Sequence, residues 1–117
     1  MFRVMEKSHD NFVALEAGGD ITTDELLQVE KDLEERIQKH GKINWMCVWK
    51  GKAYSNVGTF YKDMMWLLKN IKHFDRMAIV GDAWWKKLLV EADGLVFGEK
   101  YFDVSQEEEA WNYVQGK

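Results

Sequence analysis

Residues 54–74 read YSNVGTFYKDMMWLLKNIKHF, and they predict an amphipathic helix from Thr59 to Ile71. The apolar residues recur at i, i+4, i+7, i+8 and i+11, the spacing of a helix face that packs on a core. These residues are Phe60, Met64, Leu67, Leu68 and Ile71.

The same helix also carries Tyr61, Met65 and Trp66, which make its apolar arc wider than packing on one face of a sheet requires. The second edge therefore needs a cover of its own. A neighbouring helix, a partner chain or an apolar ligand would each provide one.

A polar loop from Gly51 to Gly58 comes before this helix and follows the apolar run Ile43 to Trp49. The run has strand length and is almost wholly apolar, as in an interior strand covered on both faces. Open α/β sheets commonly place their binding sites where such a strand gives way to a loop and a helix.

Toward the N-terminus, two strands at Phe2 to Lys7 and Phe12 to Ala17 flank the polar turn Ser8 to Asn11 and predict a β-hairpin. Thr22 and Glu25 have the spacing of a capping box. They open a helix that ends at Gly41 and places four apolar residues on one face, namely Leu26, Val29, Leu33 and Ile37.

Toward the C-terminus, His73 to Asp75 is expected to be a connection, and Met77 to Val80 a second interior strand. Asp82 can cap a short helix, Ala83 to Glu91. Either Leu95 to Gly98 or Lys100 to Val104 supplies the last strand.

The motif Ser105-x-x-Glu108 resembles a second capping box and predicts a terminal helix. Its inward-facing residues would be Ala110, Trp111 and Val114. The complete order is β-β-α-β-α-β-α-β-α, which predicts one α/β domain over residues 1–117. Its sheet should be mixed and mainly parallel, with helices packed against it and an antiparallel edge from the hairpin.

Composition and charge argue against several classes of function. A net charge of −4 with dispersed lysines argues against nucleic-acid binding, and no apolar run has the length of an integral membrane segment. The charged N-terminus is unlike a secretory signal, so a cytoplasmic location is expected. Cys47 is expected to be a buried hydrophobe, and no cofactor or metal motif occurs, neither zinc spacing nor a phosphate-binding loop.

Catalysis is not expected, because no nucleophile and base pair with a supporting residue is evident. His9 falls in the hairpin turn, His40 at a helix end and His73 in a connection, which places all three in solvent. The acidic run Glu107 to Glu109 fits the first turn of a helix rather than a metal site.

Four stretches resemble the SpoIIAA-like proteins, a family similar in fold to STAS domains and more distantly to the lipid-binding domain of Sec14 proteins. They are Gly19-Asp20-Ile21-Thr22, His40-Gly41-Lys42, Ile79-Val80-Gly81-Asp82 followed by Ala83-Trp84-Trp85, and Lys100-Tyr101-Phe102-Asp103 before Glu109-Ala110-Trp111. The resemblance implies a STAS-like binding domain.

Anti-anti-sigma relatives are switched by phosphorylation of a serine that begins the helix after the central strand. Here Ser55 and Thr59 are the hydroxyls in that neighbourhood, and the family's Asp-Ser-Ser/Gly signature is absent. The similarity to Sec14 instead implies a small apolar or lipid-like ligand.

The candidate ligand site therefore has one wall on the helix Thr59 to Ile71 and another at the Trp84–Trp85 turn. Its residues are Phe60, Tyr61, Met64, Met65, Trp66, Trp84 and Trp85. The competing interpretations are that these side chains are core, that they form a homodimer seam, or that they bind a protein partner of the anti-sigma-factor-antagonist (STAS) kind.

Overall fold

The computed structural model describes residues 1–19, 21–50, 65–66, 69–82 and 100–117. Five strands form one sheet in the order β1-β2-β3-β4-β5. The first pair is antiparallel and the other three pairs are parallel. The strands are β1 (Phe2–Val4), β2 (Phe12–Gly18), β3 (Ile43–Lys50), β4 (Phe74–Gly81) and β5 (Lys100–Asp103).

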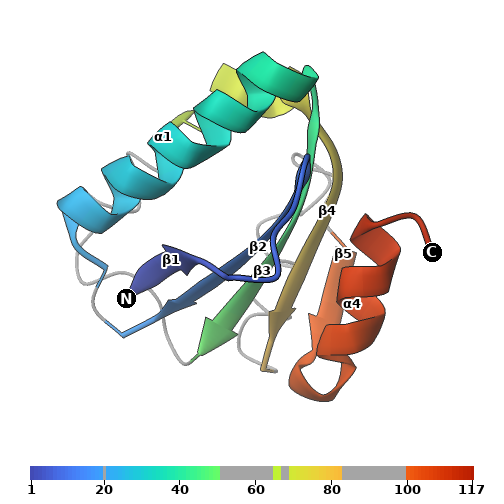
Figure 1. Ribbon diagram of the computed structural model, residues 1–117. Coiled ribbons are helices and arrows are strands. Elements are labelled where there is room, and N and C mark those ends of the chain that lie inside the picture. The colour runs from blue at the N-terminus through green and yellow to red at the C-terminus, as the bar shows by residue number, and fades with distance from the viewer. Residues whose placement is uncertain (20, 51–64, 67–68, 83–99) are drawn as a thin grey trace.

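Helices cover both faces of the sheet (Figure 1). Helix α1 (Thr23–His40) lies across one face, and helix α4 (Glu107–Val114) packs on the other, chiefly against β4 and β3. A mixed, mainly parallel sheet with an antiparallel edge is the architecture that the sequence predicts, and the structure confirms it.

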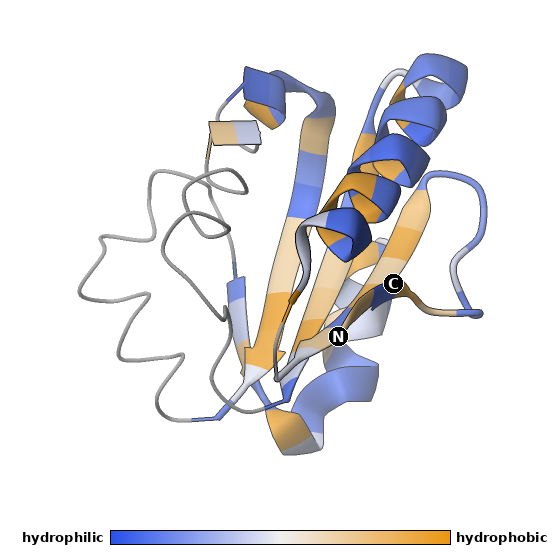
Figure 2. Ribbon diagram, turned by 90° about the vertical axis from the view of Figure 1, so that its left-hand side faces the viewer, coloured by the Kyte–Doolittle hydropathy of each residue, from blue (hydrophilic) through white to orange (hydrophobic). Residues whose placement is uncertain are grey.

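Helix α1 follows its sequence signals. The Thr22 hydroxyl accepts a hydrogen bond from the Glu25 amide, and the Glu25 carboxylate accepts one from the Thr22 amide, so the capping box is confirmed. The helix ends at Gly41, whose φ of 84° suits a residue without a Cβ. Its four predicted inward residues are all buried, and Figure 2 shows the apolar side of α1 facing the sheet.

The central strand β3 is buried at every residue except Lys50, as expected for a strand between two helical layers. Gly18 explains how closely β2 approaches it. A Cβ at Gly18 would lie 2.8 Å from the Lys50 carbonyl oxygen, so a side chain there would push the two strands apart.

Two predicted strand boundaries are wrong. Strand β1 ends at Val4 instead of Lys7. Strand β4 begins at Phe74, a residue that the sequence predicts in a connection. Phe74 is buried and pairs with Ile43. The exposed Asp75 and Arg76 that follow it interrupt the apolar pattern from which a strand is predicted. Asp75 therefore also lies in β4.

The second capping box is also shifted from its expected position. Asp103 and Gln106, rather than Ser105 and Glu108, exchange the two capping hydrogen bonds, and they open the short 3-10 helix η3 (Val104–Gln106) that leads into α4. The pairs Asp103–Gln106 and Ser105–Glu108 both have capping-box residue types at the same spacing, so the sequence is compatible with either pair as the cap. In α4, Ala110 and Val114 are buried as expected, whereas Trp111 is half-buried.

Several expectations lie outside the described residues. They concern the loop Gly51 to Gly58, the helix Ala83 to Glu91 and the strand Leu95 to Gly98. Of the helix Thr59 to Ile71, residues 65–66 and 69–70 are described and helical, and Ile71 belongs to the 3-10 helix η1 (Ile71–His73).

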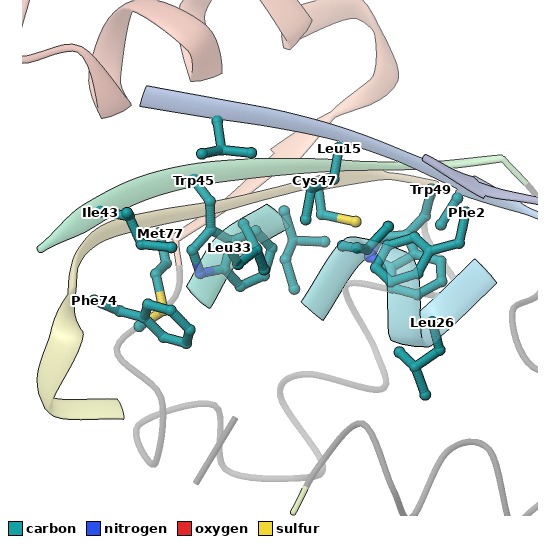
Figure 3. Packing of buried hydrophobic residues seen from close by; sticks show 14 of the residues in the cluster. Phe2, Leu15, Leu26, Leu33, Ile43, Trp45, Cys47, Trp49, Phe74 and Met77 are labelled. Carbon is teal, nitrogen blue, oxygen red and sulfur yellow. The ribbon is translucent and has the colours of Figure 1, made fainter. Parts of the chain in front are cut away.

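Buried side chains form a separate core on each face of the sheet. The α1-face core is rich in aromatic rings, several of which Figure 3 shows between the sheet and α1. Its large members include Phe2, Leu26, Leu33, Ile43, Trp45, Trp49, Phe74 and Met77. The α4-face core is made of Ala14, Met46, Val48, Ala78, Val80, Phe102, Ala110 and Val114.

Candidate binding cavity

An apolar cavity of about 30 Å³ lies within the α1-face core. Strands β1 to β4, helix α1 and Trp66 all contribute to its wall. Its lining residues are Phe2, Leu15, Val29, Glu30, Leu33, Trp45, Cys47, Trp49, Trp66 and Phe74. The alternation of side chains along β3 explains why Trp45, Cys47 and Trp49 all reach the same face.

Trp66 forms the outer part of this wall and is half-buried. Its indole N–H donates a hydrogen bond of 2.9 Å to Oε1 of the exposed Glu34 on α1. Its ring centroid lies 5.8 Å from that of Phe74. The predicted helix therefore does reach the core through Trp66, and it joins α1 there by a polar contact.

Trp45 forms an inner part of the wall and is only 6% exposed. Among the described residues, no side chain or backbone group accepts a hydrogen bond from its Nε1. The Phe74 and Trp45 rings form a T-shaped pair, with centroids 6.4 Å apart and planes at 72°. Buried indole N–H groups usually find a partner, so this one is unusual.

Two acidic side chains of α1 lie at or near the cavity. Glu30 is half-buried in the lining, and Glu34 lies outside it at Trp66.

The predicted ligand residues divide into three groups. Trp66 lines the cavity. Met65, its neighbour, is 48% exposed and lies outside that lining. The remaining five, Phe60, Tyr61, Met64, Trp84 and Trp85, lie outside the described residues, as do the hydroxyls Ser55 and Thr59.

Sequence reasoning missed the inner half of the cavity. Trp45 and Trp49 were assigned to an ordinary interior strand, and Phe2 and Phe74 were not considered as wall residues. A signal was present in the sequence, because two tryptophans four residues apart on a strand point to the same face.

A second, polar hollow of about 300 Å³ lies on the surface at the C-terminal end of α1. Its charges satisfy one another: Arg36 donates to the Asp32 carboxylate at 2.6 Å and to the Asp10 carbonyl oxygen at 2.9 Å. Lys39 and His40 complete a rim of both signs. Its lining thus mixes three carboxylates, those of Asp10, Asp32 and Glu35, with the cations of Arg36 and Lys39.

The buried carboxylate of Glu16 lies at the end of the sheet away from this hollow. Lys50 Nζ is 2.8 Å from its Oε2, and Arg3 Nη2 is 2.9 Å from its Oε1. The hydrogen bond from Lys50, followed by that from Arg3, holds the pKa of Glu16 below its ordinary value although burial opposes the shift. Glu16 thus acts as an ionised cross-strand link.

Tyr101 ties the ends of β4 and β5 together. Its hydroxyl lies 2.6 Å from the Gly81 carbonyl oxygen and 2.8 Å from that of Asp82. Burial, together with the neighbouring Asp103, raises the pKa of Tyr101 to about 12. The hydroxyl is therefore a neutral donor at physiological pH.

The other single-residue expectations are mostly confirmed. Cys47 is 2% exposed, and His9 and His40 are exposed. His73 is instead half-buried, with Nδ1 3.3 Å from the Gly41 carbonyl oxygen.

In the described part of the chain, no three or more His, Cys, Asp or Glu side chains gather closely enough to hold a metal ion. None of the helices in that part combines the length and apolar character needed to cross a bilayer.

Comparison with known proteins agrees with this architecture. A crystal structure of an uncharacterized DUF3478-family protein with a SpoIIAA-like fold, from Shewanella loihica PV-4, superposes with a TM-score of 0.72. The two chains are 18% identical over 97% of this chain and 93% of the other, a likeness that establishes the fold. No curated protein matches the chain. A sequence model described as SpoIIAA-like matches residues 12–115, and the chain therefore belongs to the SpoIIAA-like family.

Proposed function

We propose that this protein is a non-catalytic binding module that holds a small apolar ligand in the cavity between α1 and the sheet. The observation that carries the proposal is the cavity itself, whose wall is almost entirely apolar and includes four aromatic residues besides Trp66. Binding sites for small apolar molecules are typically concave and lined mainly by apolar and aromatic side chains. The SpoIIAA-like fold, shared with regulatory and interaction modules, supports binding over catalysis.

Filling the cavity with a ligand is favourable in free energy. An empty apolar cavity costs about 24 cal/mol per Å³, so 30 Å³ costs about 0.7 kcal/mol of stability. A ligand that fills the space regains these contacts and removes its own apolar surface from water.

The size of the cavity limits how a ligand enters. A volume of about 30 Å³ accommodates a group about as large as a water molecule. A larger guest requires Trp66 to move outward. That movement exchanges the hydrogen bond to the exposed Glu34 for one to water, which costs little free energy.

The proposal can be tested with cyclopentane, a compact hydrocarbon, followed by the indole N–H signals in ¹H–¹⁵N NMR spectra. Single Trp→Phe variants assign the signals. We expect saturable shifts for Trp45 and Trp66, which line the cavity, and none for Trp111, which lies on the α4 face. Unchanged Trp45 and Trp66 signals up to the solubility limit of cyclopentane would contradict the proposal.

A blocking variant provides a second test. Leu33→Phe places a larger side chain at the cavity wall and should abolish cyclopentane binding. Leu27→Phe is the matched control, because Leu27 lies on the same helix but is 56% exposed. Circular dichroism establishes that both variants fold, and equal binding by two folded variants would show that cyclopentane occupies another place.

The second candidate function is a protein-interaction module, either a regulator of the anti-sigma-factor-antagonist type or a homodimer. Its supporting observation is Met65, an exposed apolar side chain directly beside Trp66. Under this alternative, Met65→Asp should reduce self-association in sedimentation velocity experiments without lowering stability. Concentration-independent monomers of the unaltered protein would exclude the homodimer.

A further inference from the structure

The indole N–H of Trp45, a residue of the cavity wall, has no hydrogen-bond partner among the described residues. Trp45 is 94% buried, so bulk water does not reach this group. Figure 3 shows the nitrogen on the edge of the ring toward Phe74, another residue of the cavity wall. The Phe74 ring beside it contains no oxygen or nitrogen, and even the face of an aromatic ring is a weaker acceptor than an oxygen.

An unmet donor in an apolar cavity selects for a ligand that brings an acceptor. A pure hydrocarbon leaves the donor unpaired, whereas a carbonyl or ether oxygen satisfies it. The gain is large because sites built to pair a polar group discriminate strongly against ligands that lack the complementary one.

The charge of the acceptor is also constrained. Glu34, whose carboxylate accepts the Trp66 indole N–H just outside the cavity, would repel a carboxylate when ionised. An anion would also lose its hydration in a space without described cationic lining residues. A neutral oxygen avoids both penalties.

We propose that the natural ligand is a small, uncharged, mostly apolar molecule whose single carbonyl or ether oxygen accepts a hydrogen bond from Trp45 Nε1. This inference rests on the proposed function, since it assigns the polar end of a ligand in the same cavity. Trp45 is the residue that determines this preference, and Trp66 bounds the space from outside.

Tetrahydrofuran and cyclopentane are suitable probes because they have nearly the same shape and differ by one ether oxygen. Their affinities are measured by NMR titration against the unaltered protein and Trp45→Phe. We expect Trp45→Phe to weaken tetrahydrofuran binding about tenfold and cyclopentane binding less than twofold. Trp111→Phe, the same substitution on the opposite face, should leave both affinities unchanged.

A measurement on the unaltered protein keeps the test independent of how well Trp45→Phe folds. The Trp45 indole proton should shift downfield with tetrahydrofuran, because the ether accepts its hydrogen bond. Its shift with cyclopentane should not be downfield, because cyclopentane has no acceptor. Cyclopentanecarboxylate should bind more weakly than tetrahydrofuran at neutral pH.

The outcomes separate the two proposals. If neither neutral probe binds, the proposed function fails and this inference fails with it. If both bind but Trp45→Phe affects them equally and the indole proton does not move downfield, the cavity binds ligands and the role of Trp45 is wrong. Tighter binding of the carboxylate would overturn the preference for a neutral acceptor.

Discussion

A helix covers each face of the sheet, but the two cores between helix and sheet are built from different side chains. On the α4 face, the core includes small side chains such as Ala78, Val80 and Ala110, which let helix α4 pack closely on the strands. On the α1 face, large rings such as Trp45 and Trp49 hold the helix on a thicker layer. Large rigid rings fill a curved space less completely, and the apolar cavity is on this face.

The comparison teaches where the protein can admit a guest. Close-packed small residues leave little freedom, so the α4 face suits a purely structural role. The α1 face combines a gap, a buried unpaired donor and a half-buried outer wall at Trp66. Four substitutions test this difference, beginning with the largest expected effect.

Met46→Ala should cause the largest loss, about 2–5 kcal/mol of unfolding free energy, because Met46 is fully buried in the α4-face core. Met65→Ala is the matched control and should change stability by less than about 0.5 kcal/mol, since Met65 is exposed. Urea unfolding measures both. Similar losses in the two variants would mean that Met65 is covered by another part of the protein.

Ala78→Leu should cost about 1–3 kcal/mol, because the added carbons must fit between β4 and α4. Urea unfolding measures the loss against the unaltered protein. A neutral result would show that the α4 face has spare room, and the contrast between the faces would then be lost.

Glu16→Gln should lower stability by about 1 kcal/mol at pH 7, because Lys50 and Arg3 lose their ionised partner while both remain largely hydrated. The pKa of Glu16 is lowered in the folded protein, so its stabilisation is present above the ordinary value of about 4.3 and is lost as pH falls through the lowered value.

The difference in unfolding free energy between Glu16→Gln and the unaltered protein should therefore shrink in acid below about pH 4.3. Urea unfolding at several pH values follows it. A difference that stays constant from neutral pH to strong acid would show that ionisation of Glu16 does not contribute.

Val29→Ile should have the smallest effect and the opposite sign. Val29 lines the cavity, so one added methylene fills empty space and should raise stability by about 0.5 kcal/mol. Thermal unfolding detects the gain. A loss comparable to that of Ala78→Leu would mean that the α1 face is as closely packed as the other.

Much of the fold could be predicted because its signals are local. The capping box at Thr22, the helical period through Leu26 to Ile37 and the apolar run of β3 each depend on a few neighbouring residues. The start of β4 could not be predicted, because Phe74 is a strand residue only through its pairing with Ile43. The choice of Asp103 rather than Ser105 as the capping residue likewise depends on how β5 leads into α4.

The candidate site was predicted only at its outer edge. The wide apolar arc of the predicted helix Thr59 to Ile71 indicated Trp66, because this pattern lies within one segment of the sequence. The inner wall draws on residues from four strands and α1, and tertiary packing alone decides that Trp45 and Phe74 meet. An unpaired indole N–H is likewise a property of the folded surroundings, and sequence patterns carry no sign of it.

Crystals pressurised with xenon test the central claim most directly, because xenon enters apolar cavities without needing polar groups. The account predicts a xenon peak within the α1-face core, in contact with Leu33 and Trp45. The absence of xenon from this position, with xenon bound instead in the α4-face core, would contradict it.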